Sequence, residues 1–196
     1  MSREARRAQI IEATIKVVAQ QGVRGASTAR IAHEAGVAEG TLYRHFSSRS
    51  EIIFAAVESW FQAIHDFSLA AQSPDAIEWL LGIMRNHLVY FGSHEPDLSR
   101  VFLQFAAASP GDGASDHLYR RQKETNTFLA EIVQMGKDQG TIRAEVDPDQ
   151  AAWQLVVVLW ADQITWSMNP EHTVESQRTI QLYEQVIRSL RADPRP

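Results

Sequence analysis

A glycine between two short helical patterns constrains the fold of this chain more than any other feature. Ser27, a residue type that caps helix N-termini, precedes the first pattern, and Gly36 follows it. Gly36 suits a tight turn because glycine reaches positive φ without a Cβ clash. Leu42 and Phe46 then recur at the spacing of a second short helix. The pattern predicts a helix-turn-helix at about residues 27–46.

The rest of the chain also has helical periodicity. Apolar residues with one-face spacing run from Ile10 to Val18, and Ser50 is placed to cap a long helix after the motif. Further helices are predicted, to within about three residues at each end, over residues 74–91, 98–108, 115–138, 149–168 and 173–190. A loop rich in Gly, Ser and Pro is expected at 107–115, and a frayed end at 192–196.

Segments of strand length with alternating polarity are missing from the sequence, which predicts an all-α fold with about nine helices. The length of 196 residues allows one or two compact domains. We expect a three-helix N-terminal domain at residues 1–48, followed by a larger helical domain at residues 49–196.

Composition narrows the class of protein. The chain has no cysteine, which excludes disulfides, thiolate metal sites and a cysteine nucleophile. Apolar residues make up 44% and charged residues 22%, as in ordinary globular proteins. The N-terminus lacks the apolar core of a signal peptide, and the longest apolar run, residues 155–161, is too short to cross a bilayer. We therefore expect a cytoplasmic protein with no membrane partner.

The net charge of −5 conceals an asymmetry along the chain. Residues 1–50 carry eight Lys and Arg against four Glu, a net charge of +4. The remaining residues carry 11 basic and 20 acidic side chains, a net charge of −9. A basic segment on an acidic chain indicates contact with a polyanion, although a chance cluster of solvated arginines gives the same count.

The outer side of the second short helix is suited to nucleic acid. It combines a carboxylate and a glycine with hydroxyl, phenol, guanidinium and imidazole groups: Glu39, Gly40, Thr41, Tyr43, Arg44 and His45. The donors among them can bind phosphates or base edges, and Gly40 would let the helix start lie close to DNA. The alternative is a surface helical hairpin with incidental aromatics, but the basic segment favours DNA.

The same residues resemble the TetR family of transcriptional regulators. The resemblance rests on the string Thr28…Ile31-Ala32…Ala35-Gly36-Val37…Gly40-Thr41-Leu42-Tyr43…His45-Phe46…Arg49…Ile52. Three positions depart from the family pattern. Ala38 replaces a serine, so this helix should lack a side-chain N-cap, whereas Arg49 and Ile52 replace lysine and leucine and keep the charge and the burial.

The resemblance implies a role for each matching residue. Contacts with the DNA backbone are implied for Thr28, Arg30, Thr41, Tyr43, His45 and Arg49. For Arg30, contact with a base edge is the alternative. Contacts with bases are implied for Ala38, Glu39, Gly40 and Arg44. Arg44 is the best candidate for reading guanine. Glu39 either accepts a hydrogen bond from cytosine or is a solvated residue that repels phosphates. Arg3, Arg6 and Arg7 either add phosphate contacts or form a disordered, solvated arm.

The resemblance also implies a small-molecule pocket in the larger domain. Most of the large apolar side chains of this region must form the core. The pocket walls are expected among Trp60, Ile64, Phe67, Met84, His87, Phe91, Phe102, Phe105, Trp153 and Trp160, with His87, Tyr90, Gln104 or Asn126 as polar anchors. Aromatic and methionine walls suit an apolar or aromatic effector.

The helix expected at residues 149–168 is apolar on two faces. One face carries Ala152, Leu155, Val156 and Leu159, and the other carries Trp153, Val157, Trp160 and Ile164. A helix that is apolar all round is buried on two sides, by its own core and by another element. The last helix adds a stripe of Ile180, Tyr183, Ile187 and Leu190. The two helices predict a homodimer interface, unless the first is the central helix of a monomer.

These features predict a ligand-responsive repressor that binds a palindromic operator as a dimer and is released by its effector. The alternative is a helical small-molecule-binding protein or enzyme with a vestigial helix-turn-helix. No enzymatic activity and no cofactor are expected, because the sequence has no phosphate loop, dinucleotide fingerprint or nucleophile elbow. No metal site is expected either, because His87 and His94 are seven residues apart and have no partner at ligand spacing.

Overall fold

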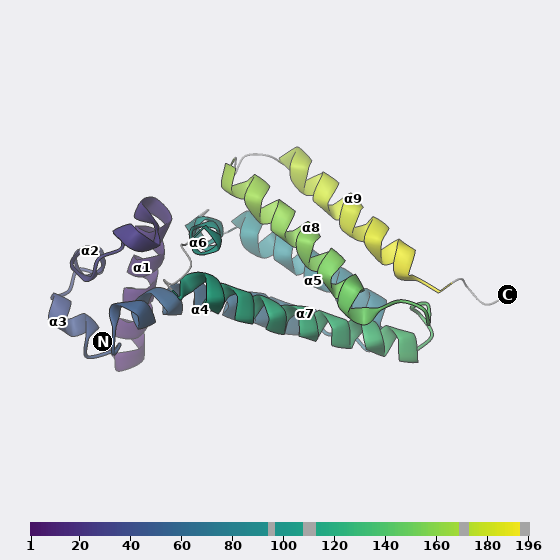
Figure 1. The fold of residues 1–196 in the computed structure, drawn as a ribbon, viewed down its shortest axis with the longest axis horizontal. Helices are drawn as coiled ribbons and strands as arrows, with labels where there is room; N and C mark the ends of the chain where they lie inside the picture. The colour runs from purple at the N-terminus through teal and green to yellow at the C-terminus, as the bar shows by residue number, and fades with distance from the viewer. Residues whose placement is uncertain (94–96, 108–112, 169–172, 193–196) are drawn as a thin grey trace. The chain divides into compact units, whose positions relative to one another are not determined.

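The computed structural model describes residues 1–93, 97–107, 113–168 and 173–192. Over these ranges the chain forms nine helices and no strand (Figure 1). The helices are α1 (Arg3–Gly25), α2 (Thr28–Glu34), α3 (Glu39–Leu42), α4 (Arg49–Ala70), α5 (Ala76–Ser93), α6 (Asp97–Ala106), α7 (Ala114–Asp138), α8 (Pro148–Met168) and α9 (Thr173–Leu190). The predicted all-α fold is confirmed. None of the helices within the described ranges is long and apolar enough to cross a membrane.

The chain forms two compact units whose limits differ from the predicted division at residue 48. The first unit contains residues 1–63, α6 and the start of α7 up to Tyr119. The second contains the rest of α4, α5, the remainder of α7, α8 and α9. The long helices α4 and α7 therefore each contribute to both units.

In the first unit, α1 packs against α2 and α6, and α2 packs against α3. The side chains of Ile10, Val17 and Val18 are buried, as the apolar stripe predicts. Gly22 has a φ of 72°, so it ends the regular part of α1, and a short helical turn continues to Gly25. Gly22 therefore forms a kink within α1.

Side-chain caps explain where most of these helices begin. Ser27 accepts a hydrogen bond from the Arg30 N–H at the start of α2, as predicted. At α3, Ala38 makes no side-chain cap, which was also predicted. The cap predicted at Ser50 is wrong: Ser48 Oγ accepts from the Glu51 N–H at 3.1 Å. The hydroxyl of Ser47 and, to a lesser extent, its backbone N–H donate hydrogen bonds to Glu51, and these hold the pKa of Glu51 below its ordinary value.

In the second unit, α9 packs against both α5 and α8 (Figure 1). The phenol of Tyr183 is fully buried and donates to the Leu80 carbonyl of α5 at 3.1 Å. The end of α9 is tied to the loop before α8, because the Ala192 N–H donates to the Thr141 carbonyl at 2.9 Å. Ala192 is therefore not frayed, whereas the rest of the predicted tail and most of the predicted loop at 107–115 lie outside the described residues.

Candidate DNA-binding site

A small buried core holds α2 and α3 in their mutual orientation. The side chains of Ile31 and Leu42 are completely buried, and Phe46 is 2% exposed. Gly36 has a φ of 62°, the left-handed conformation predicted for this turn. The Val37 N–H closes the turn by donating to the carbonyl of Ala32 at 2.9 Å. The turn and the core together determine which side of α3 is presented outward.

The side chains predicted to contact DNA lie around this core. Arg30, Ala38, Glu39, Gly40, Tyr43 and Arg44 are exposed, and Thr28, Thr41, His45 and Arg49 are half-buried. Tyr43 is an exposed large ring, with 52% of its surface accessible. Because α3 ends at Leu42, Tyr43, Arg44 and His45 lie on the turn that follows it rather than within the helix. The structure thus gathers the predicted side chains on one small unit.

Two side-chain pairs order this surface. The Thr28 hydroxyl donates to the carboxylate of Glu39, which links the start of α2 to the start of α3. The guanidinium of Arg44 donates to the Thr41 hydroxyl at 2.9 Å. The second carboxylate oxygen of Glu39 can still accept a hydrogen bond from a base.

The arginines at the N-terminus are helical, so the alternative of a disordered arm is wrong. α1 begins at Arg3, and Ser2 Oγ caps it by accepting from the Ala5 N–H at 3.0 Å. A groove runs beside this helix start, lined by Met1, Ser2, Arg3, Arg6, Gly36, Val37, Ala38, Thr41, Arg44 and His45. Three guanidinium groups on one groove make it suitable for a phosphate.

Arg49 makes contacts within the protein that the sequence did not suggest. Its Nε donates to the Ala26 carbonyl at 2.9 Å, and its Nη2 donates to the Val23 carbonyl. These carbonyls follow the kink at Gly22, where the last turn of α1 gives way to α2. Arg49 therefore joins the start of α4 to the end of α1, whether or not it also contacts phosphate.

Residues 10–56 match the family model described as "Bacterial regulatory proteins, tetR family". The N-terminal region of the chain is therefore similar to that of the TetR family. The match includes the buried core, the turn at Gly36 and the exposed side chains around α3. The family predicted from the string of residues 28–52 is confirmed.

Curated relatives and solved structures extend the comparison. The chain is 36% identical over 83 residues to the HTH-type transcriptional regulator TtgR of Pseudomonas putida, covering 42% of this chain and 39% of TtgR. It spans 27–39% of the length of the first three curated relatives it matches. The fatty acid degradation regulator FadR of Bacillus halodurans has the same fold, with a TM-score of 0.82 at 21% identity, over 94% of this chain and 99% of FadR.

The side chains predicted to line an effector pocket are divided between the two units. Trp60, Phe102 and Phe105 lie in the first unit, and Ile64, Phe67, Met84, His87, Phe91, Trp153 and Trp160 lie in the second. In the first unit, Trp60 and Phe102 stack with ring centroids 4.8 Å apart. Trp153 is 46% exposed, so it lies on the surface of its unit.

An aromatic cluster with a buried histidine occupies part of the second unit. The ring centroids of His87 and Phe91 are 4.7 Å apart, and those of Phe67 and His87 are 6.0 Å apart. Tyr90, a predicted polar anchor, is 5.8 Å from Phe67, and burial, followed by the charge of Asp66, raises its pKa. The structure therefore brings Phe67, His87 and Phe91 together, as the predicted pocket requires.

Sequence reasoning missed two polar partners of this cluster. His87 Nε2 lies 3.3 Å from the carboxylate of Asp162 and 3.1 Å from the amide nitrogen of Gln163. All three side chains are buried. The sequence feature that indicates these partners is that Asp162 and Gln163 interrupt the apolar residues of α8. A polar group buried in such a helix needs a polar partner.

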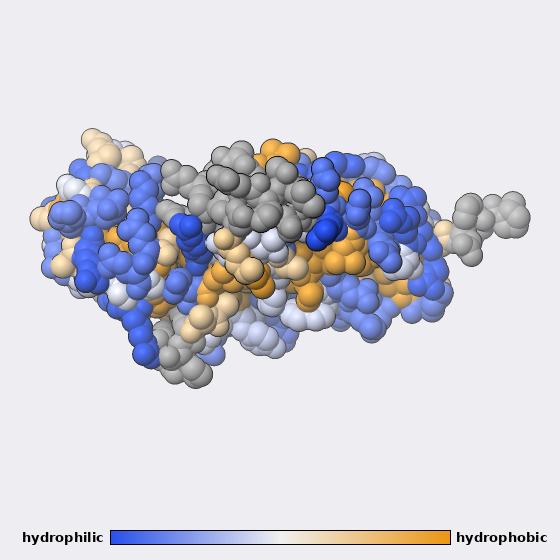
Figure 2. Space-filling model, turned by 90° about the horizontal axis from the view of Figure 1, so that it is seen from above, coloured by the Kyte–Doolittle hydropathy of each residue, from blue (hydrophilic) through white to orange (hydrophobic). Residues whose placement is uncertain are grey.

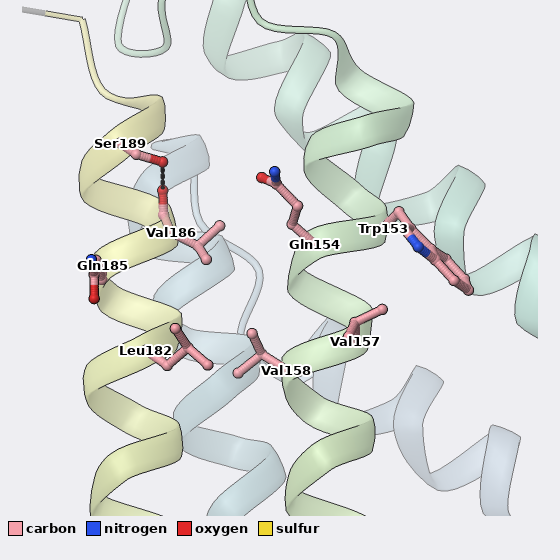
Figure 3. Close-up of a pocket in the computed structure, with 8 residues that line it drawn as sticks. All are labelled: Trp153, Gln154, Val157, Val158, Leu182, Gln185, Val186 and Ser189. Atoms are coloured by element: carbon pink, nitrogen blue, oxygen red, sulfur yellow. Dashed lines mark hydrogen bonds between the residues drawn. The ribbon is translucent and has the colours of Figure 1, made fainter.

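The exposed apolar surface of α8 and α9 is the other candidate site. Trp153, Val157 and Ile164 of α8 are 42–46% exposed, while Ala152 and Leu155 on the opposite face are buried. Figure 2 shows a hydrophobic band along α8 and α9, with hydrophilic residues on both sides. In Figure 3, Val158, Leu182 and Val186 point toward one another between the two helices.

The contribution of α9 to this surface differs from the predicted one. The predicted stripe packs into the protein's own unit, since Tyr183, Ile187 and Leu190 are buried. The residues of α9 that line the surface groove are instead Leu182, Gln185, Val186 and Ser189 (Figure 3). We refer to these four residues, together with Trp153, Gln154, Val157 and Val158, as the α8–α9 surface.

Proposed function

We propose that the chain is a transcriptional repressor that binds a palindromic operator as a dimer and is released by a small apolar or aromatic molecule. The observation that carries this proposal is the arrangement around α3. Hydroxyl, phenol and guanidinium groups surround a short helix whose other side is a fully buried core. Such donors bind phosphates and base edges, and the net charge of +4 over residues 1–50 favours a polyanion.

The α8–α9 surface supports the dimeric part of the proposal. An exposed apolar strip with polar margins is typical of a protein–protein interface. A second copy of the same strip would cover Val157 and Leu182, which are 42% and 48% exposed. A twofold dimer also matches the symmetry of a palindromic operator, whose half-sites lie roughly 34–36 Å apart.

The ring cluster of Phe67, His87 and Phe91 supports the effector part. These side chains form an aromatic wall with one polar group inside the second unit. The solved structure of FadR from Bacillus subtilis, at 22% identity and a TM-score of 0.80, is a complex with stearoyl-CoA. The stearoyl chain of that ligand is apolar, as are the rings of this cluster, whereas its CoA part is charged.

A binding experiment with DNA tests the proposal. Fluorescence anisotropy with the DNA that flanks the chain's own gene should give an affinity at least about a thousandfold above that for scrambled DNA. The affinity should fall steeply as salt is raised, since phosphate contacts release counterions. Equal affinity for both DNAs would contradict the proposal and favour the alternative of a helical small-molecule-binding protein or enzyme with a vestigial motif.

A further inference from the structure

Polar side chains buried in the second unit differ in how well they are partnered. His87, Asp162 and Gln163 contact one another, as described above. Gln122 of α7 is also buried, with 5% of its surface exposed, but one atom of its amide is unpaired within the described part of the chain. A buried amide has two N–H donors and one oxygen acceptor to satisfy.

Trp160 fixes the orientation of the Gln122 amide. The indole Nε1–H of Trp160 donates to Gln122 Oε1 at 3.0 Å. Because an indole nitrogen can only donate, the amide oxygen must face Trp160 and the amide nitrogen must face away from it. That nitrogen is buried and has no hydrogen-bond partner among the residues that the structure describes. An unpaired buried donor is unfavourable, so it indicates a partner that is missing from the free chain.

Asn126 provides a second unpaired atom one helical turn along α7. Residues four apart lie on the same face of a helix. The Oδ1 atom of Asn126 is also buried and, over the described ranges, without a hydrogen-bond partner. α7 therefore offers a hydrogen-bond donor from Gln122 and an acceptor from Asn126 on one face.

The amide pair is connected to the aromatic cluster through α8. Trp160, which contacts Gln122, and Gln163, which contacts His87, are three residues apart and so are neighbours on that helix. All of these residues belong to the second unit. A molecule that reached from Gln122 toward His87 would find polar groups at one end and aromatic rings at the other.

We propose that the effector has an uncharged head group that accepts a hydrogen bond from Gln122 and donates one to Asn126. A carboxamide or a hydroxyl does both, whereas an ester can only accept. A carboxylate would place a negative charge against Asn126 Oδ1, in the unit that already buries the carboxyl group of Asp162. This assignment rests on the proposed function, because it names the class of effector to which the repressor responds.

Calorimetric titration of the full chain with three probes that share one ring system tests the assignment. The probes are 2-naphthamide, methyl 2-naphthoate and 2-naphthoate. The amide should bind about tenfold more tightly than the other two, the effect of one additional hydrogen bond. Equal or tighter binding of the ester or the carboxylate would overturn the assignment. Failure of 2-naphthamide to bind up to its solubility limit would also overturn it.

Variants of α7 locate the contact. Gln122→Met keeps the side-chain length and removes the donor that both the amide and the ester can use, so it should weaken the binding of both probes by about tenfold. Gln134→Met, a matched change at an exposed position of α7, should leave both affinities unaltered. Trp160→Phe in α8 keeps Gln122 but removes the group that orients its amide, and it should also weaken the binding of both probes.

Thermal unfolding, monitored by circular dichroism, shows which variants fold. The comparison of the three probes uses the wild-type protein, so it does not depend on the folding of any variant. If the folded Gln122→Met variant binds the amide and the ester with wild-type affinity, the contact is not at Gln122. Operator binding by the same protein preparations separates this assignment from the proposed function. Specific DNA binding without amide preference overturns only the assignment, whereas amide preference without specific DNA binding overturns only the proposed repressor function.

Discussion

Arg44 is the residue of this surface that we expect to read a base. It is exposed on the turn after α3, and its guanidinium is oriented by the Thr41 hydroxyl. If it binds guanine, Arg44→Ala should cost roughly 1–3 kcal/mol on the operator and relax the preference at one base position. Anisotropy with a set of singly substituted operators measures both effects. Arg85→Ala, at an exposed arginine of α5, is the matched control. Unchanged affinity and preference would refute base reading by Arg44.

The observed structural role of Arg49 can be separated by experiment from its proposed phosphate contact. Because its guanidinium donates to the carbonyls of Val23 and Ala26, Arg49→Met should lower the free energy of unfolding by about 1–2 kcal/mol. If Arg49 also binds a phosphate, the slope of log affinity against log salt should fall by about one. Urea unfolding gives the first quantity and a salt titration gives the second. Reduced stability with an unchanged slope would show that Arg49 acts only within the protein.

Residue roles were predictable to different degrees from the sequence. The exposed positions around α3 follow from helical spacing, because the buried residues Leu42 and Phe46 determine the outer side. The carbonyl contacts of Arg49 were not predictable, because they join residues more than 20 positions apart at a kink. The locked amide of Gln122 depends in the same way on Trp160 of another helix.

At the scale of helices, α9 depends on the buried phenol of Tyr183. Burial raises the pKa of this group above its ordinary value of 10.0, so the native state keeps a proton that the unfolded chain releases at high pH. The free energy of unfolding should therefore fall as the pH rises above about 10. Tyr183→Phe should remove this contribution, and at neutral pH it should cost about 1 kcal/mol through the lost bond to Leu80.

Urea unfolding near neutral pH and above about pH 10 measures both effects. Tyr119→Phe is the control, because Tyr119 is 70% exposed. An identical pH dependence in Tyr183→Phe and the wild type would contradict the role assigned to burial.

Helix positions were largely predictable, because apolar spacing and caps are local properties of the sequence. Local signals did not decide between two nearby serines at the start of α4, where Ser48 rather than Ser50 forms the cap. Spacing alone also could not tell which apolar face of α9 packs inward. The stripe with Tyr183 packs into the core of its own unit, and Leu182 is left on the α8–α9 surface.

At the scale of the whole molecule, the α8–α9 surface predicts a dimer. Val157 is 42% exposed in the single chain, so Val157→Glu should leave the protomer folded but place an unpaired carboxylate in the dimer interface. Sedimentation velocity at micromolar concentration should show a dimer for the wild type and a monomer for the variant. Val89→Glu, at a 71% exposed valine of α5, should remain dimeric. A wild-type monomer, or a dimeric Val157→Glu, would contradict the proposed interface.

The division of the molecule was less predictable than its helices. The sequence placed a boundary near residue 48, at the end of the helix-turn-helix, whereas the first compact unit extends to residue 63 and includes α6. That inclusion depends on packing between α1 and α6, which are about 70 residues apart in sequence and share no local signal. Because the first unit extends to residue 63 and includes α6, it contains the predicted pocket residues Trp60, Phe102 and Phe105.

Operator and effector should oppose each other through α4, which begins in the first unit and ends in the second. An effector can release the operator only if it binds more tightly to the form that does not bind DNA. Linkage then requires saturating operator to weaken effector binding by the same factor, and a coupling of roughly 1–3 kcal/mol is typical. Calorimetric titration of an effector from a thermal-shift screen, with and without operator, measures this factor. Scrambled DNA of equal length should leave the affinity unchanged. Equal affinities with and without operator would mean that the compound is not an inducer or that α4 does not couple the two sites.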